Sequence, residues 1–194
     1  LTKNDLDYID KFLIFLGILH TDMHIEALHF SGKYFNYGFL EEMIISNNRL
    51  LEIEFIEIPE GEFIQGNTKE KEILSFDNER PSFKQVIKKF SVSKYPITQH
   101  QFMEFIRNGG YFKREYWSEK GWSWKREKLI NYPLYYKDFI DSNLPMYHIS
   151  YYEAEAFCKM FNYRLLYEKE WEYLATNGGE TLYPWGNKMD KNKC

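Results

Sequence analysis

The sequence predicts an α+β protein in which one long helix precedes a domain of short strands, short helices and loops. Apolar residues recur at helical spacing from Leu6 to Ala27. From Leu51 to Ile58, apolar and acidic residues instead alternate with a period of two, which is typical of a half-buried strand. The change of period between these segments indicates two structural parts.

Composition and charge exclude several classes of protein. The 194 residues are 19% aromatic, which supplies ample material for a core, and the net charge of −4 gives no basic surface for nucleic acid. No run of about 18 uncharged apolar residues suggests a membrane span. Two cysteines, Cys158 and Cys194, cannot make a disulfide framework, so we expect a reducing, cytoplasmic compartment. The chain begins at Leu1 rather than at an initiator Met, and it ends at Cys194, soon after the motif that closes at Asn187. We therefore interpret it as a fragment.

The first predicted element is a long amphipathic helix. Asn4 or Asp5 can cap its start, and the apolar periodicity carries it to about Phe30. Gly17 costs a helix about 1 kcal/mol relative to Ala, so its presence suggests close packing against a neighbour. Ser31-Gly32 offers an end, and the alternative is that the aromatic residues Tyr34, Phe35 and Tyr37 extend the helix by a turn before Gly38. Such a helix cannot bury its own apolar stripe, and its natural companions are other helices of a bundle.

This helix carries a histidine pair, His20 and His24, at a spacing of four residues. Two imidazoles one turn apart lie on the same helix face and can reach one metal ion. The same face carries Leu13, Leu16 and Ala27, so we expect the pair to look inward. By spacing alone, histidines on an apolar helix face are more often satisfied core or surface residues than metal ligands. A metal site needs at least one more ligand from elsewhere.

The second part opens with predicted strands. Residues 39–48 form a mixed segment that ends in a polar linker, and the strand from Leu51 to Ile58 follows. Pro59-Glu60-Gly61 then supplies a turn before Phe63-Ile64, which predicts a hairpin. After a polar stretch, Gln85 to Val92 predicts another strand.

Three short helices and a turn follow in the prediction. Thr98 caps the first helix with Gln101 at the third helical position, and Gly109-Gly110 ends it. Ser150 and Glu153 make the same box for a second helix, in which Cys158 is a small core residue rather than a nucleophile. The other elements are a helix over residues 168–175 with Trp171 facing inward and a turn at Tyr183-Pro184-Trp185-Gly186.

The segment from Gly109 to Trp124 is the most aromatic in the chain and has neither a helical nor a strand period. One interpretation is a loop that lines a ligand pocket, with ring faces for a positively charged substrate. The other is a long loop that its aromatic rings pin to the core. Both interpretations stay open, and the second is favoured.

Seven ordered motifs in residues 55–187 resemble the formylglycine-generating-enzyme/sulfatase-modifying-factor domain, a variant of the C-type lectin fold with little regular structure. The chain departs from the usual pattern at Tyr151, where the family has Trp, and at Leu166-Tyr167, where it has Pro-Thr. The matching motifs are Ile58-Pro59-Glu60-Gly61-Glu62-Phe63 with Gly66, Asp77-Asn78-Glu79-Arg80-Pro81, Pro96-Ile97-Thr98 with Phe102 and Phe105, Gly109-Gly110-Tyr111, Ile149-Ser150-Tyr151-Tyr152-Glu153-Ala154, Arg164-Leu165 with Glu168 and Glu170-Trp171-Glu172-Tyr173, and Tyr183-Pro184-Trp185-Gly186-Asn187.

The histidine pair, as His20-xxx-His24-x-Glu26, resembles the end of a DinB-like helical bundle. A DinB-like bundle before such a domain is similar to the iron-dependent sulfoxide synthases of ergothioneine, ovothiol and selenoneine biosynthesis. The motifs Tyr116-Trp117-Ser118 and Gly121-Trp122 also resemble that branch. The expected organisation is therefore a bundle helix over residues 1–38, a linker over 39–52 and a C-terminally truncated formylglycine-generating-enzyme domain over 53–194.

The resemblance implies that His20 and His24 are two ligands of a three-histidine iron(II) (Fe²⁺) centre, with the third on an earlier helix. It implies C–S or C–Se bond formation between a cysteine-type thiol or selenium donor and a histidine-derived imidazole, using O₂. No catalytic residue is assigned, and the role of Glu26 stays open. Met23 stands where some ergothioneine enzymes have a polar residue, so their substrates are not carried over. Two alternatives remain: formylglycine generation on sulfatases and a non-catalytic lectin-like binding module.

Overall fold

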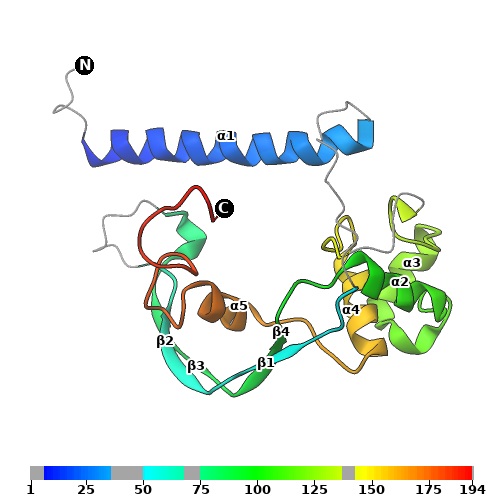
Figure 1. Ribbon diagram of the computed structural model, residues 1–194. Coiled ribbons are helices and arrows are strands. Elements are labelled where there is room, and N and C mark those ends of the chain that lie inside the picture. Colours follow the sequence, from blue (N-terminus) through cyan, green and yellow to red (C-terminus); the bar gives the residue numbers. More distant parts are fainter. Residues whose placement is uncertain (1–6, 36–49, 68–74, 137–142, 194) are drawn as a thin grey trace. The chain divides into compact units, whose positions relative to one another are not determined.

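The computed structural model describes residues 7–35, 50–67, 75–136 and 143–193 (Figure 1). The chain divides into two compact units. The first unit comprises residues 1–45 and 64–84, and the second comprises residues 46–63 and 85–194. The expected boundaries at residues 38 and 52 stay a prediction, and most of the expected linker lies outside the described residues.

The first unit contains one uninterrupted helix, α1 (Tyr8–Phe35), as Figure 1 shows. Asp7 caps it, because Asp7 Oδ1 accepts a hydrogen bond from the Asp10 N–H at 2.8 Å. The candidate caps Asn4 and Asp5 lie outside the described residues. The helix passes through Gly32 and ends at Phe35, so the stop offered by Ser31-Gly32 is not used and the alternative extension through the aromatic residues is confirmed as far as Phe35. A single glycine costs a helix about 1 kcal/mol, which does not by itself stop it.

The close packing against a neighbouring element that was expected at Gly17 of α1 is not observed. A Cβ placed on Gly17 has no atom within 4 Å apart from the helix itself. Close packing at Gly17 is therefore not formed within the part of the chain that the structure describes.

The described part of residues 64–84 is held by local hydrogen bonds around η1 (Asp77–Glu79). Gly66 has φ +82°, and a Cβ there would lie 2.8 Å from the Glu79 carbonyl oxygen. The same oxygen accepts a hydrogen bond from the Asn67 N–H at 2.8 Å. Only glycine fits this turn without strain, because other residues rarely adopt a positive φ.

The strands pair in a different order from the predicted one. β1 (Phe55–Ile58) pairs antiparallel with β4 (Phe90–Ser93), and Ile58 lies opposite Phe90. β2 (Gly61–Gln65) pairs instead with β3 (Phe83–Ile87). The predicted hairpin between the first two strands is therefore wrong. A period of two identifies a strand and its buried face, but it does not identify the partner strand.

The predicted strand from Gln85 to Val92 is also two strands. β3 ends at Ile87 and β4 begins at Phe90, so Lys88-Lys89 separates them. Ile87 and Phe90 are buried together with Phe63 in one hydrophobic cluster of the second unit.

Both predicted capping boxes are confirmed in the second unit. α2 (Gln99–Arg107) begins at Thr98, whose Oγ1 accepts from the Gln101 N–H at 3.3 Å while Gln101 Oε1 accepts from the Thr98 N–H at 2.9 Å. α4 (Tyr151–Met160) begins at Ser150 in the same way, with Glu153 as its partner. Each box satisfies two backbone groups that a helix start leaves without partners.

The aromatic segment contains more regular structure than its sequence predicts. η2 (Arg114–Tyr116) and α3 (Glu119–Glu127) occupy its second half, and Ser118 caps α3 by accepting from the Gly121 N–H at 3.2 Å. The expectation of no helix is therefore wrong for this half. Short helices with little apolar periodicity are recognised by their caps, and Ser118 was the available signal.

The main core of the second unit lies among α2, α4 and the aromatic segment. Tyr111 and Trp117 are 0% and 1% exposed, and Trp117 Nε1 donates to the Gly110 carbonyl at 2.8 Å. α4 packs against α2, α3 and η2. The three helices α2, α3 and α4 lie together in Figure 1. This burial supports the interpretation that the aromatic rings pin the segment to the core.

The last helix, α5 (Glu168–Ala175), has the predicted bounds but a different buried face. Trp171 is 64% exposed, so the expectation that it faces inward is wrong. Glu170 is buried instead, and it forms two hydrogen bonds with the Arg164 guanidinium at 2.6 and 2.7 Å. The predicted turn at Tyr183–Gly186 is confirmed by two backbone hydrogen bonds of 3.0 Å.

We expect Tyr111→Phe to lower the free energy of unfolding by about 2 kcal/mol, because it removes a hydrogen bond to the buried Glu153 carboxylate. The Tyr111 hydroxyl donates to Glu153 Oε1 at 2.5 Å, and burial raises the pKa of Tyr111 above its ordinary value, so the hydroxyl stays protonated. Urea denaturation measures the change. Tyr151→Phe is the matched control, since Tyr151 is 65% exposed. Equal effects of the two changes would contradict the expectation.

We expect Glu170→Gln to reduce stability at pH 7 by roughly 1 kcal/mol, a value that allows for the half-exposed Arg164. Hydrogen bonding from Arg164 lowers the pKa of Glu170 below its unfolded value of about 4.3. The stabilisation is thus present above that pH and is lost as pH falls through the folded pKa.

Urea denaturation between pH 7 and 3 tests this dependence. The loss of stability of the native chain below about pH 5 should be shallower in Glu170→Gln. Glu180→Gln, at an exposed position, should leave the curve of the native chain unchanged. Parallel curves for the native chain and Glu170→Gln would show that this ion pair does not contribute.

Candidate metal-binding pair

His20 and His24 lie on one face of α1, one turn apart, as their spacing predicts. Their Nε2 atoms are 2.9 Å apart, within hydrogen-bond distance. The ring centroids are 4.5 Å apart and the ring planes are nearly perpendicular, at 82°. One imidazole therefore donates to the other, and the two Nε2 atoms face each other.

This geometry fits two ligands of one metal ion. Imidazole nitrogens bind transition-metal ions at about 2.1 Å. Two such nitrogens in adjacent coordination positions therefore lie about 3 Å apart. The observed separation of 2.9 Å matches that requirement. Within the described ranges, no group of three or more His, Cys, Asp or Glu side chains is placed to hold a metal. Metal ligation by His20 and His24 therefore stays a prediction, and this part of the chain does not supply a third ligand.

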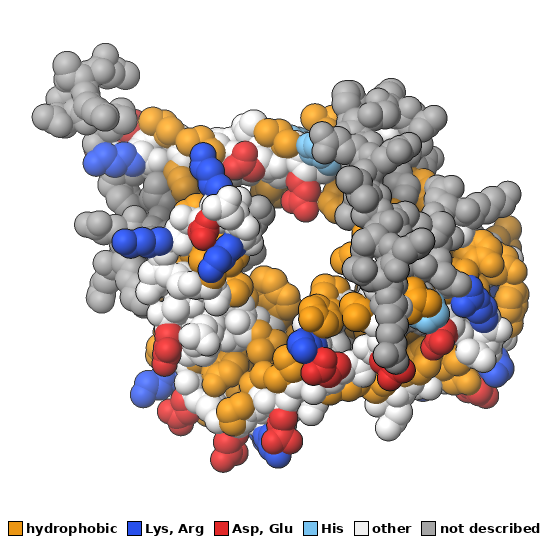
Figure 2. Space-filling model, in the orientation of Figure 1, with side chains coloured by type: hydrophobic (Ala, Val, Ile, Leu, Met, Phe, Trp, Pro, Cys, Tyr) orange, Lys and Arg blue, Asp and Glu red, His pale blue; other side chains and the backbone are white. Residues whose placement is uncertain are grey.

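The surroundings of the pair are exposed along α1. Both histidines are exposed, as are Leu13, Met23 and Leu28, and hydrophobic side chains gather along α1 in Figure 2. These exposures describe α1 by itself, so the inward orientation of the pair stays a prediction. Despite its apolar surface, α1 does not qualify as a membrane-spanning helix, and neither does any other described helix.

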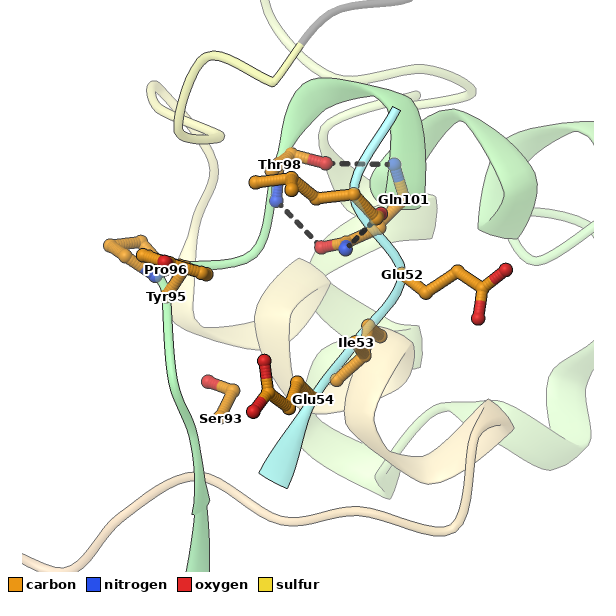
Figure 3. A pocket seen from close by; sticks show the side chains of 9 residues that line it. Glu52, Ile53, Glu54, Ser93, Tyr95, Pro96, Thr98 and Gln101 are labelled. Atoms are coloured by element: carbon orange, nitrogen blue, oxygen red, sulfur yellow. Dashed lines mark hydrogen bonds between the residues drawn. The ribbon is translucent and has the colours of Figure 1, made fainter. Parts of the chain in front are cut away.

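A small depression in the second unit lies where the segment before β1 meets the start of α2 (Figure 3). Gln101 Nε2 donates to the Leu51 carbonyl at 2.9 Å, while its Oε1 accepts from Thr98. The polar groups of Gln101 are thus used in joining two segments of the chain. The lining residues are Leu51, Glu52, Ile53, Glu54, Ser93, Tyr95, Pro96, Thr98 and Gln101.

Two further reactive side chains of the second unit are Cys158, which the sequence predicted as a core residue, and Lys125, which it did not. Cys158 packs against the main core, and burial raises the pKa of its thiol, in line with the predicted small core residue. Lys125, which sequence reasoning missed, is buried beside two aromatic rings. Lys125 follows Trp122 by three residues, a spacing that predicts contact between the two side chains only if the segment is a helix.

Comparison with known proteins agrees with the α+β architecture of few short strands. Residues 42–194 match the family of the Sulfatase-modifying factor enzyme 1-like domain, and the chain belongs to this family. It is related to the hercynine oxygenase of Mycobacterium tuberculosis, with 31% identity over 142 residues that cover 65% of this chain and 33% of that protein. The hercynine oxygenase of Mycolicibacterium smegmatis is 30% identical over 145 residues, covering 67% of this chain and 34% of that protein.

The chain is also similar to a protein that is named as inactive. The inactive C-alpha-formylglycine-generating enzyme 2 of Mus musculus is 25% identical over 169 residues, covering 71% of this chain and 52% of that protein. The relatives thus include proteins named as enzymes and a protein named as inactive. The chain spans about a third of the length of the hercynine oxygenases that it matches.

Proposed function

We propose that this chain is part of a non-heme iron(II), O₂-dependent sulfoxide synthase. The enzyme would join a cysteine-type thiol or a selenium donor to a histidine-derived imidazole through a C–S or C–Se bond. The observation that supports this best is the 2.9 Å separation of the His20 and His24 Nε2 atoms. The relation to hercynine oxygenase at 31% identity supports the same class of reaction.

In this proposal His20 and His24 hold the iron through Nε2, and bound iron(II) supplies the activation of O₂ and the oxidation of sulfur. Neutral imidazoles bring no charge to the metal, so the site keeps its attraction for an anionic thiolate. Because both rings are attached to one turn of the same helix, the relative position of the two ligand nitrogens stays fixed. The resemblance to the sulfoxide synthases also implies a catalytic tyrosine, and we propose that it and the third histidine lie outside residues 1–194.

The second unit has a different role in the proposal. Its C-type-lectin-like body would provide a rigid frame for substrate-binding loops, and α1 would be the last helix of a DinB-like bundle. The short strands and capped helices fit such a frame, because buried rings and local hydrogen bonds fix them without a large sheet. The particular thiol and imidazole are left open.

Iron content of the full protein that contains this chain tests the proposal. We expect about one iron per chain, because an open catalytic centre takes three protein ligands, and at least a tenfold weaker affinity for iron in His20→Ala or His24→Ala. His29→Ala is the matched control, since His29 is an exposed histidine of the same helix outside the pair. Atomic emission spectroscopy after anaerobic loading with iron(II) measures the metal.

The outcomes separate the candidate functions. Sulfoxide product and O₂ consumption that require both histidines would support the synthase. Full iron retention in His20→Ala and His24→Ala would overturn the assigned ligands. A protein that binds no iron would favour a non-catalytic binding module, and oxidation of a cysteine-containing sulfatase peptide would favour formylglycine generation.

A further inference from the structure

Tyr111 and Glu153 form a buried donor and acceptor pair in the main core of the second unit. Both side chains are almost fully covered, and the Tyr111 hydroxyl donates to Glu153 Oε1 at 2.5 Å. The other carboxylate oxygen accepts from the Ser150 N–H at 2.7 Å. A hydroxyl bonded to a carboxylate at this distance is a strong, charge-assisted hydrogen bond. A proton acceptor is therefore already in place for the Tyr111 hydroxyl.

A line of tyrosine rings connects this pair with the surface. The ring centroid of Tyr132 lies 6.3 Å from that of Tyr111, and Tyr136 stacks on Tyr132 at 4.6 Å with the ring planes 18° apart. Aromatic rings in contact have centroid separations of about 4.5–7 Å, so neighbouring rings of this line touch. Tyr132 is 45% exposed, and a molecule in the solvent can therefore reach the line at this ring.

Tyr111 is the place on this line where an oxidised tyrosine is most stable. A tyrosine gives up one electron far more readily when its hydroxyl proton leaves at the same time, and Glu153 provides for that at Tyr111. Within the described ranges, the hydroxyls of Tyr132 and Tyr136 form no hydrogen bond with a carboxylate. An electron vacancy that enters at Tyr132 therefore moves inward to Tyr111.

Burial favours loss of the electron and transfer of the proton in one step. Burial raises the pKa of Tyr111, so the phenolate does not form first. Loss of the electron alone would leave a cationic ring in the core, which is costly there. The coupled step avoids both charged intermediates, because it converts a neutral phenol and a carboxylate into a neutral radical and a neutral carboxylic acid.

We propose that Tyr111 and Glu153 form a redox site that one-electron oxidants, such as oxygen-centred or nitrogen-centred radicals, oxidise through Tyr132. The oxidant gains one electron, the O–H bond of Tyr111 breaks, and the proton passes to Glu153 Oε1. The product is a phenoxyl radical inside the core, where it cannot meet a second radical and dimerise. The iron proposed for His20 and His24 takes no part in this step.

Flash photolysis of the native chain without added metal tests this proposal. Ruthenium(III) tris-bipyridine, generated by a light flash with a cobalt(III) electron acceptor, is the oxidant, and electron paramagnetic resonance detects tyrosyl radicals. We expect a long-lived neutral tyrosyl radical that is lost in Tyr111→Phe. It should be retained in Tyr151→Phe, the matched control at a position that is 65% exposed. An identical long-lived signal in Tyr111→Phe would overturn the proposal.

Tyr132→Phe tests the path from the surface and leaves the Tyr111 and Glu153 pair in place. The change keeps the ring, and the circular dichroism spectrum should stay that of the native chain. Phenylalanine is not oxidised by this reagent, so we expect the Tyr111 radical to form about tenfold more slowly, which corresponds to roughly 1.4 kcal/mol in the barrier. An unchanged rate would overturn the role of Tyr132.

The proton acceptor is tested in the native chain, because a substitution of Glu153 could prevent folding. Since the proton passes within the protein, the Tyr111 radical should form more slowly after exchange into D₂O, and its rate should not depend on the concentration of phosphate buffer. A rate that rises with buffer concentration would overturn the assignment of Glu153. None of these measurements involves iron, so their outcome is separate from that of the iron test.

Discussion

The second unit depends on one buried carboxylate, that of Glu153. Its Oε1 accepts from the Tyr111 hydroxyl at 2.5 Å and its Oε2 accepts from the Ser150 N–H at 2.7 Å. Both carboxylate oxygens are therefore satisfied in a place where an unpaired charge would be costly. The same two bonds fix the start of α4 and attach it to the turn after α2, so a single side chain sets both the local helix and the packing of the core.

Aromatic packing replaces extended sheet in holding this unit together. The two sheets seen in the described residues contain two strands each, which is marginal for independent stability. Phe102, Phe105 and Phe157 instead pack around Tyr111 and Trp117, with ring centroids 5.3 to 6.1 Å apart along their contacts. Large rings bury much apolar area for each ordered residue and so stabilise a fold of short elements.

Unlike the aromatic core, which needs contacts between segments distant in sequence, the geometry of the histidine pair is set within α1. The helical repeat alone brings the two Nε2 atoms to 2.9 Å. A complete metal centre needs more, since a third ligand has to come from a separate element and both charge and water access have to be controlled. The family relation therefore supports the class of reaction. The histidine pair supports only two ligands of the proposed metal centre.

The sequence by itself determined the features that a few neighbouring residues control. These include the long helix, the capping boxes at Thr98 and Ser150, the bounds of α5 and the two-histidine geometry. Only the tertiary structure decided which strands pair, that Glu170 rather than Trp171 is the buried residue of α5, and that Lys125 lies between two rings. The reason is physical: caps and helical spacing act over a single turn, whereas strand partners and buried charges are chosen by residues distant in sequence.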